Sequence, residues 1–200
     1  MRFVLASRSP ARLATLRSAG IEPEVVVSGV DEDALLEQLT DASAAEQVVA
    51  LAEAKAREVA DRIDGDAVVI ACDSMFEMDG EVRGKPADAQ DAIARLKQMR
   101  GNHGTLHTGH HVMAGGRGVS AAARTEVHIG EMSDGEIAAY VGTGEPLQVA
   151  GSFTIDGLGG WFVEHLEGDH TNVIGISLPL VRRMLADVDI DITKYFSKLS

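Results

Sequence analysis

The sequence predicts an α/β fold built on a mixed β-sheet. Apolar runs of strand length alternate with helical patterns in the N-terminal half, and hairpin signals dominate the middle of the chain. The chain has 200 residues, 45% of them hydrophobic and 24% charged, which is enough for one domain with two lobes and a substantial core. We expect this domain to span residues 1–188 and a loose C-terminal tail to follow over residues 189–200.

The N-terminal segment predicts a strand, a helix and a second strand. Residues 3–6 are an apolar run of strand length. Ser9 and Pro10 then suit the cap and the first turn of a helix, which Gly20 brings to an end. Residues 22–27 have the pattern of a second strand, so the chain begins as a strand–helix–strand unit.

The next segment predicts an acidic loop, a long helix and a buried strand. The loop lies at residues 31–33, and Ser43 and Glu46 have the capping-box spacing that begins a long helix. Residues 67–71 are an unbroken apolar run, which is typical of a strand buried on both faces. We expect this strand to end at Cys72-Asp73-Ser74.

The middle of the chain predicts two hairpins with a helix between them. Asp79-Gly80 has the composition of a tight hairpin turn. Asp88 suits the cap of a helix that closes at Gly101. Residues 105–113 and 119–129 flank a Gly-Gly pair and are expected to form the longer hairpin.

The C-terminal third predicts two more helices. Ser133 and Glu136 have capping-box spacing and begin the first of them. A glycine-rich stretch over residues 142–160 leads into an expected strand at residues 161–163. Ser177 then suits the cap of the last helix.

Charge and cysteine content exclude several classes of protein. The 18 basic and 31 acidic residues give a net charge of −13, which opposes binding to a nucleic-acid backbone. Cys72 is the only cysteine, so no internal disulfide forms and a reducing compartment is the expected setting. No apolar stretch has the length of a signal peptide or a membrane span. We therefore expect a cytoplasmic protein that binds neither nucleic acid nor membranes.

Lys55 is the most informative cation in the sequence. Helical periodicity places it on the same face as Val48, Ala52 and Val59, which is the apolar face of the long helix. A lysine that points into the core requires an anion beside it. Alternatively, its aliphatic stem follows the apolar surface and the ammonium reaches solvent at the helix edge. Periodicity leaves both interpretations open.

Two other places suit phosphate and metal chemistry. Asp73 follows a buried strand, and ligand sites of open α/β sheets collect at such strand ends. Its carboxylate could hold a divalent cation or activate water, although a turn aspartate is the ordinary alternative. Ser7 and Ser9, together with Arg12, combine hydroxyls, helix N–H groups and a guanidinium that suit a phosphate. An ordinary capped turn would use the same residues.

Other motif-like patterns carry less weight. Residues 80–86 lack one residue and the hydroxyl of a P-loop, and residues 157–160 lack the third glycine of a dinucleotide fingerprint. Four histidines close in sequence suggest a metal site, but alternate residues of an extended segment face opposite ways and no cysteine or HExxH partner accompanies them. These four are His103, His107, His110 and His111. Three other histidines are isolated in the sequence and receive no role: His128, His165 and His170.

A series of short motifs has a characteristic order and spacing. The motifs are Leu5-Ala6-Ser7-Arg8-Ser9-Pro10-Ala11-Arg12, Asp31-Glu32, Leu51-Ala52-Glu53-Ala54-Lys55-Ala56, Asp79-Gly80 with Gly84-Lys85-Pro86, Thr108-Gly109, Gly144-Glu145-Pro146, Ala150-Gly151-Ser152-Phe153 and Glu167-Gly168-Asp169. Together they resemble the Maf family, the nucleoside triphosphate pyrophosphatases also called septum formation proteins. The resemblance extends over residues 3–185.

The resemblance implies an elongated mixed sheet with flanking helices in two lobes, similar to the inosine triphosphate pyrophosphatase fold, with a nucleotide cleft between the lobes. It implies hydrolysis of nucleoside triphosphates, especially non-standard or modified ones, to monophosphate and pyrophosphate with Mg²⁺ or Mn²⁺. It also suggests a homodimer. Asp73 matches the proton acceptor, and Glu32 joins Asp73 at the metal. Ser7, Arg12, Lys55 and Lys85 match the phosphate-handling positions, and we expect Ser9 to bind substrate together with them.

Three residues are candidates for base specificity. Ala11, Ser74 and Asp156 stand where the pyrimidine-cleaving branch of the family has arginine, threonine and glutamine. The acidic residue at 156 resembles the branch that cleaves 7-methyl-GTP, whereas Asp73-Ser74 differs from the Asp-Gln of that branch. A carboxylate could accept hydrogen bonds from the N1–H and N2–H₂ of guanine. The preferred base stays open.

Two other functions are alternatives to hydrolysis. A non-enzymatic regulator of cell division would bind nucleotide without turnover, and it has no need of a water-activating carboxylate. A nucleotidyl or phosphoryl transferase would form product only with a second substrate in place of water.

Overall fold

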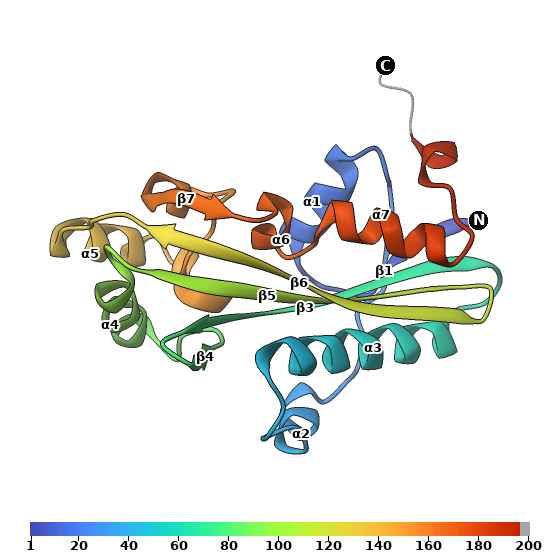
Figure 1. The fold of residues 1–200 in the computed structure, drawn as a ribbon, viewed down its shortest axis with the longest axis horizontal. Helices are drawn as coiled ribbons and strands as arrows, with labels where there is room; N and C mark the ends of the chain where they lie inside the picture. The colour runs from blue at the N-terminus through green and yellow to red at the C-terminus, as the bar shows by residue number, and fades with distance from the viewer. Residues whose placement is uncertain (197–200) are drawn as a thin grey trace. The chain divides into compact units, whose positions relative to one another are not determined.

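A computed structural model describes residues 1–196 and divides into two compact units. Unit 1 comprises residues 1–73 and 108–123 and the described residues from Gly175 onward, and unit 2 comprises residues 74–107 and 124–174. Helices accompany one sheet of seven strands in the order β2-β1-β3-β5-β6-β7, with β4 paired to β3 (Figure 1). The predicted α/β class with a mixed sheet is confirmed.

Unit 1 has a sheet that is buried on both faces. Strand β1 (Arg2–Leu5) pairs in parallel with β2 (Glu24–Val25) and with the first half of β3 (Ala67–Met78). Helix α3 (Ala44–Arg62) lies on one side of these strands, and α1 (Pro10–Ser18) and α7 (Leu178–Asp187) lie on the other (Figure 1). Alternate residues therefore enter two cores, with Leu5 on the α1 and α7 side and Val4 on the α3 side.

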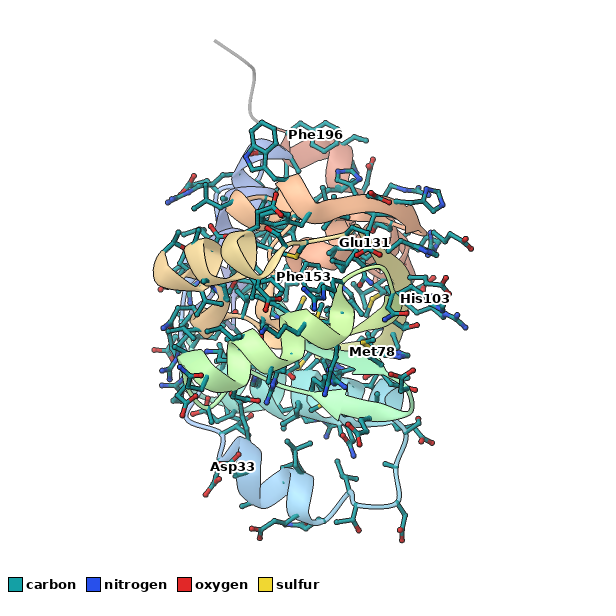
Figure 2. The ribbon with its side chains drawn as sticks, turned by 90° about the vertical axis from the view of Figure 1, so that its left-hand side faces the viewer. Asp33, Met78, His103, Glu131, Phe153 and Phe196 are labelled. Carbon is teal, nitrogen blue, oxygen red and sulfur yellow. The ribbon has the colours of Figure 1, made fainter. Side chains whose placement is uncertain are left out.

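Unit 2 packs its helices around an apolar core of its own. Its sheet contains the later part of β3, β4 (Glu81–Arg83), β7 (Val163–Glu167) and parts of β5 (His103–Ala114) and β6 (Arg117–Ile129). Its helices are α4 (Ala89–Met99), α5 (Asp134–Gly142) and α6 (His170–Ile174). Phe76 is fully buried in the core of this unit, where its ring meets Phe153 edge-on. Phe153 is labelled in Figure 2.

The local signals for helix ends and hairpin turns are confirmed. Both capping boxes form, at Ser43 before α3 and at Ser133 before α5. Asp79 and Gly80 both have positive φ, as a tight hairpin turn between β3 and β4 requires, and the Gly-Gly pair between β5 and β6 does the same. These features depend on neighbouring residues only, which explains why the sequence predicts them well.

Several element boundaries differ from the prediction. Strand β3 continues to Met78, because its later half also finds a partner, β4, instead of ending at Cys72-Asp73-Ser74. Strand β2 keeps only two residues of the expected 22–27. The acidic loop contains helix α2 (Glu32–Glu37), whose first turn is capped by the Asp31 side chain.

The C-terminal third also departs from the prediction. The glycine-rich stretch contains the short 3₁₀ turns η1 (Glu145–Gln148), η2 (Ala150–Ser152) and η3 (Leu158–Phe162), so β7 begins only at Val163. The prediction of a loose tail after residue 188 is wrong for residues 189–196. It contains the 3₁₀ turn η4 (Ile192–Tyr195), and the Tyr195 ring packs edge-on against Phe3. The rest of that tail, residues 197–200, lies outside the described residues.

Candidate functional site

A buried lysine joins two carboxylates in unit 1. Lys55 projects from the inward face of α3 and is only 7% exposed. Its Nζ lies 2.5 Å from Oδ1 of Asp73 and 2.9 Å from Oε1 of Glu32. The structure thus favours the first interpretation of Lys55, in which an inward lysine is matched by anions. We call these three residues the lysine-centred site.

Asp73 reaches this site from the interior of a strand. The parallel pairing of β1 with β3 ends at Leu5 and Ile70, and Asp73 lies three residues further along β3. The expectation that β3 ends at Asp73 was wrong, because β3 continues to Met78. Its parallel partner β1, however, ends at Leu5, and Ser7 follows in the segment after that strand. Asp73 therefore still stands at the carboxyl end of a parallel strand pair, where α/β folds place ligands.

Arg12 ties the segments around the lysine-centred site together. Its Nη1 donates to Oγ of Ser7 at 3.1 Å and to the carbonyl of Cys72 at 2.8 Å, and its Nε donates to the carbonyl of Gly175 at 2.8 Å. Ser7 is buried, and its Oγ also accepts from the N–H of Ser9 at 3.2 Å. The guanidinium therefore holds the chain after β1 against the residue that precedes Asp73.

Ser9 and Cys72 have structural roles in unit 1. The side chain of Ser9 accepts from the N–H of Arg12 and caps α1, as the ordinary interpretation of this turn predicts. Cys72 is completely buried, and burial raises the pKa of its thiol to about 12. A thiol with so high a pKa is not a nucleophile at neutral pH, so the chemistry of the region belongs to its carboxylates and cations.

The two carboxylates fit a hard divalent cation. Glu32 begins α2 with its side chain half exposed, whereas the Asp73 side chain is 13% exposed, and both reach the same ammonium. Mg²⁺ is commonly held by one or two carboxylates together with substrate phosphates. Glu32 and Asp73 are such a pair of oxygen donors, with Glu32 open to solvent.

The other sequence candidates are divided between the two units. Ala11 is in the first turn of α1, half-buried in unit 1. Ser74, Lys85 and Asp156 belong to unit 2. Lys85 is exposed in the connection between β4 and α4, and Asp156 is exposed between η2 and η3. The structure therefore brings Glu32, Lys55 and Asp73 together directly, with Ser7 and Arg12 around them through the bonds described above.

Glu145 organises unit 2 in a way that residue patterns did not reveal. Its carboxylate accepts from the hydroxyls of Tyr140 and Thr154 at 2.9 and 2.6 Å, and from the N–H groups of Leu158 and Gly159 at 3.0 Å. Burial works against the charge of this carboxyl, but the hydrogen bonds outweigh it and lower the pKa of Glu145. The network fixes the loop that carries Asp156. The Gly-Glu-Pro motif of the family resemblance was the only sequence signal at this position.

The histidines separate into different environments. His110 is fully buried in unit 1, where its Nε2 accepts from the N–H of Ser177 at 2.8 Å and its Nδ1 lies 3.0 Å from the carbonyl of Thr108. Because the Ser177 N–H can only donate, Nδ1 carries the proton. His110 is thus a satisfied core histidine. His103 lies in unit 2 beside His128, which is isolated in the sequence and was given no role there.

No helix within residues 1–196 has both the length and the apolar character needed to cross a membrane.

Comparison with known proteins gives a consistent result. The family model described as "Maf-like protein" matches residues 2–188. A relative from Streptomyces coelicolor, named nucleoside triphosphate pyrophosphatase, is 56% identical over 199 residues, covering 98% of this chain and 95% of that protein. A relative of the same name from Rhodococcus opacus is 51% identical, covering 98% and 96%.

The structural comparison includes a crystal structure of a nucleoside-triphosphatase, or dITP/XTP pyrophosphatase, from Mycobacterium abscessus. It is 20% identical with a TM-score of 0.36, covering 64% of this chain and 73% of that one. The family model and the relatives span nearly the whole sequence. On these grounds the chain belongs to the Maf family.

Proposed function

We propose that the protein hydrolyses nucleoside triphosphates to nucleoside monophosphate and pyrophosphate. The observation that carries this proposal is the lysine-centred site, where a buried ammonium holds Asp73 beside Glu32. A carboxylate beside a fixed positive charge suits water activation next to a triphosphate, whose charge needs stabilisation in the transition state. The names of the relatives support the same reaction.

Each residue of the site has a distinct role in the proposed reaction. Asp73 accepts the proton of the attacking water, and its 2.5 Å contact with Lys55 fixes the position of Oδ1. Lys55 also brings positive charge to the phosphate side of the site. Ser7 offers a hydroxyl at the start of α1, and Arg12 positions it through its Nη1 hydrogen bond. Lys85 is included as a phosphate-binding residue from the family resemblance.

A divalent cation completes the proposed chemistry. When bound, Mg²⁺ or Mn²⁺ neutralises charge on the phosphate oxygens. Glu32 and Asp73 would hold it, since both supply carboxylate oxygens close to the same point.

Ala11, Ser74 and Asp156 are the residues that we propose to set the preferred base. Ala11 places a small side chain in the first turn of α1, where the pyrimidine-cleaving branch has a long arginine. Asp156 stands in the loop held by Glu145, so its position is supported by the hydrogen bonds of that carboxylate to Leu158 and Gly159. A guanine-type base, which offers N1–H and N2–H₂ as donors, is the base class that a carboxylate acceptor at 156 suits best.

Pyrophosphate release tests the proposed function. The full chain is incubated with canonical, methylated and deaminated nucleoside triphosphates, with Mg²⁺ or Mn²⁺ and with an EDTA control. We expect metal-dependent release, and we expect Asp73→Asn to lower kcat by about 10²- to 10⁴-fold, which is the usual contribution of a general base. Asp61→Asn, an exposed carboxylate on the same helix as Lys55, is the control and should retain activity.

Two outcomes would contradict the proposal. Turnover by Asp73→Asn at the wild-type rate would show that another group is the base. Nucleotide binding without turnover at any metal concentration would instead favour a regulatory binder.

A further inference from the structure

The sheet of unit 2 carries imidazoles and carboxylates from three neighbouring strands. His103 comes from β5, Glu126 and His128 from β6, and His165 and Glu167 from β7. We call these five residues the histidine face. Val127 is fully buried, so strand alternation turns Glu126 and His128 away from the core. Figure 2 shows the labelled His103 at the right-hand margin of the view.

Ligand atoms converge in the middle of this face. One nitrogen of His103, one nitrogen of His128 and one carboxylate oxygen of Glu126 all lie within 4.8 Å of one another. The His103 and His128 rings are stacked with centroids 5.1 Å apart, and the His165 ring lies 5.3 Å from that of His128. Zinc holds its nitrogen and oxygen donors at about 2.0–2.2 Å, so an ion bound here would draw these three atoms toward one point.

The register of β6 and β7 places like residues opposite each other. Glu126 faces Glu167 and His128 faces His165 across the antiparallel pair. Like charges directly opposite on neighbouring strands destabilise a sheet. A divalent cation on this face would offset both carboxylates, in a chain whose net charge is already −13.

His128 has a nitrogen whose surroundings suit a metal better than a hydrogen bond. Its Nε2 is buried and has no hydrogen-bond partner among the described residues. It lies only 2.9 Å from Oε1 of Glu126, yet the two groups are not aligned for a hydrogen bond. Oε1 of Glu167 lies 3.8 Å from the same nitrogen. An imidazole nitrogen with carboxylate oxygens around it is a donor set of the kind that holds a divalent cation.

We propose that the histidine face binds one divalent first-row transition-metal ion, such as Zn²⁺, through His103, Glu126 and His128. His165 and Glu167 supply a further ligand or an outer hydrogen bond. Imidazole donors favour Zn²⁺ and its transition-metal neighbours, whereas Mg²⁺ requires oxygen donors. This site is separate from Glu32 and Asp73 and takes a different class of metal.

The ion would link three strands of unit 2. Strand β7 stands at the end of the sheet order and pairs with β6. Ligands on β5 and β6, with β7 residues beside them, would restrain this edge strand. Because a metal that binds only the folded state stabilises it, Zn²⁺ is expected to raise the unfolding temperature.

Calorimetric titration of the EDTA-treated full chain tests the proposal. With Zn²⁺ as the probe, we expect one ion per chain and little competition from a large excess of Mg²⁺. His128→Gln should weaken Zn²⁺ binding at least about 10-fold, the smallest loss expected even from an outer-shell partner. His170→Gln is the matched control, because His170 is exposed in the same unit but outside the histidine face.

A second variant separates this site from the proposed active site. Asp73→Asn should keep full Zn²⁺ affinity although it loses hydrolysis, so failure of one proposal would not be mistaken for failure of the other. Absorption bands of tetrahedral Co²⁺ in the wild type, lost in His128→Gln, would support ligation by these residues. Absence of stoichiometric Zn²⁺ binding, or equal affinity of wild type and His128→Gln, would overturn the proposal.

Discussion

The lysine-centred site in unit 1 and the histidine face in unit 2 both gather carboxylates, but they balance the negative charge differently. In unit 1, Glu32 and Asp73 meet the ammonium of Lys55, which helix α3 delivers to the buried side of the sheet. In unit 2, Glu126 and Glu167 face each other beside imidazoles, and no lysine or arginine within residues 1–196 forms an ion pair with either of them. The fold itself supplies one cation to the first site, whereas the histidine face has only the ion that we propose it takes from solution.

The largest effect is expected when the built-in cation is removed. Lys55→Met leaves Asp73 nearly buried without its partner, and we expect the free energy of unfolding to fall by about 3 kcal/mol. Adding Asp73→Asn to this variant should recover part of the loss, because the uncompensated charge is then gone. Chemical denaturation of the single and double variants measures both effects.

The control for this change is Lys97→Met. Lys97 pairs with Asp134 on the surface, so its loss should cost less than about 1 kcal/mol. Equal losses at Lys55 and Lys97 would contradict the view that Lys55 and Asp73 form a largely buried ion pair.

A smaller effect is expected where helix α3 approaches the sheet. A Cβ on Gly109 would overlap the carbonyl group of Val48, so Gly109→Ala must displace α3, the helix that carries Lys55. We expect a loss of about 2 kcal/mol in the free energy of unfolding and a lower kcat. Gly142→Ala has no atom within 4 Å of its new Cβ and should leave both quantities nearly unchanged, as thermal unfolding and pyrophosphate release would show.

The negative charge of the Glu145 carboxylate is stabilised by hydrogen bonds from neutral hydroxyl and N–H groups. Its lowered pKa in the folded state means that its hydrogen bonds stabilise unit 2 at pH values above the ordinary carboxyl pKa of 4.5. This contribution is lost as the pH falls through the folded-state pKa, below that value. Glu145→Gln should therefore lower the free energy of unfolding by about 1 kcal/mol at pH 7. The difference from wild type should shrink below about pH 4.5 in denaturation curves, and a difference that grew with acidity would contradict this explanation.

The smallest effect is expected at the histidine face without metal. His128→Gln in EDTA should change the free energy of unfolding by less than about 0.5 kcal/mol, because the wild-type nitrogen has no hydrogen bond to lose. Addition of Zn²⁺ should then stabilise the wild type and leave the variant unchanged. Thermal unfolding of the wild type and of His128→Gln, with and without Zn²⁺, measures both effects. A large loss of stability of His128→Gln in EDTA, comparable to that of Lys55→Met, would show that His128 has a structural role of its own.

The sequence by itself determined the features that depend on nearby residues. The capping boxes at Ser43 and Ser133, the Asp79-Gly80 turn and the place of Lys55 on the apolar face of its helix follow from caps, left-handed turn residues and helical periodicity, all of which act within a few residues. The alternation of strands and helices gave the α/β class for the same reason. Boundaries such as the end of β3 were less predictable, because a strand continues wherever a partner strand is available.

Only the tertiary structure decided which of these residues meet. Periodicity placed Lys55 on the apolar face of its helix but left open whether its ammonium meets an anion. Its contact with Asp73 and Glu32 depends on how α3 packs against β3. His103 and His128 are distant in sequence and adjacent in space because β5 and β6 are neighbours in the sheet, a relation that composition around either histidine does not reveal. The chemistry of both regions therefore arises from pairing between segments, where the energetics depend on the whole fold.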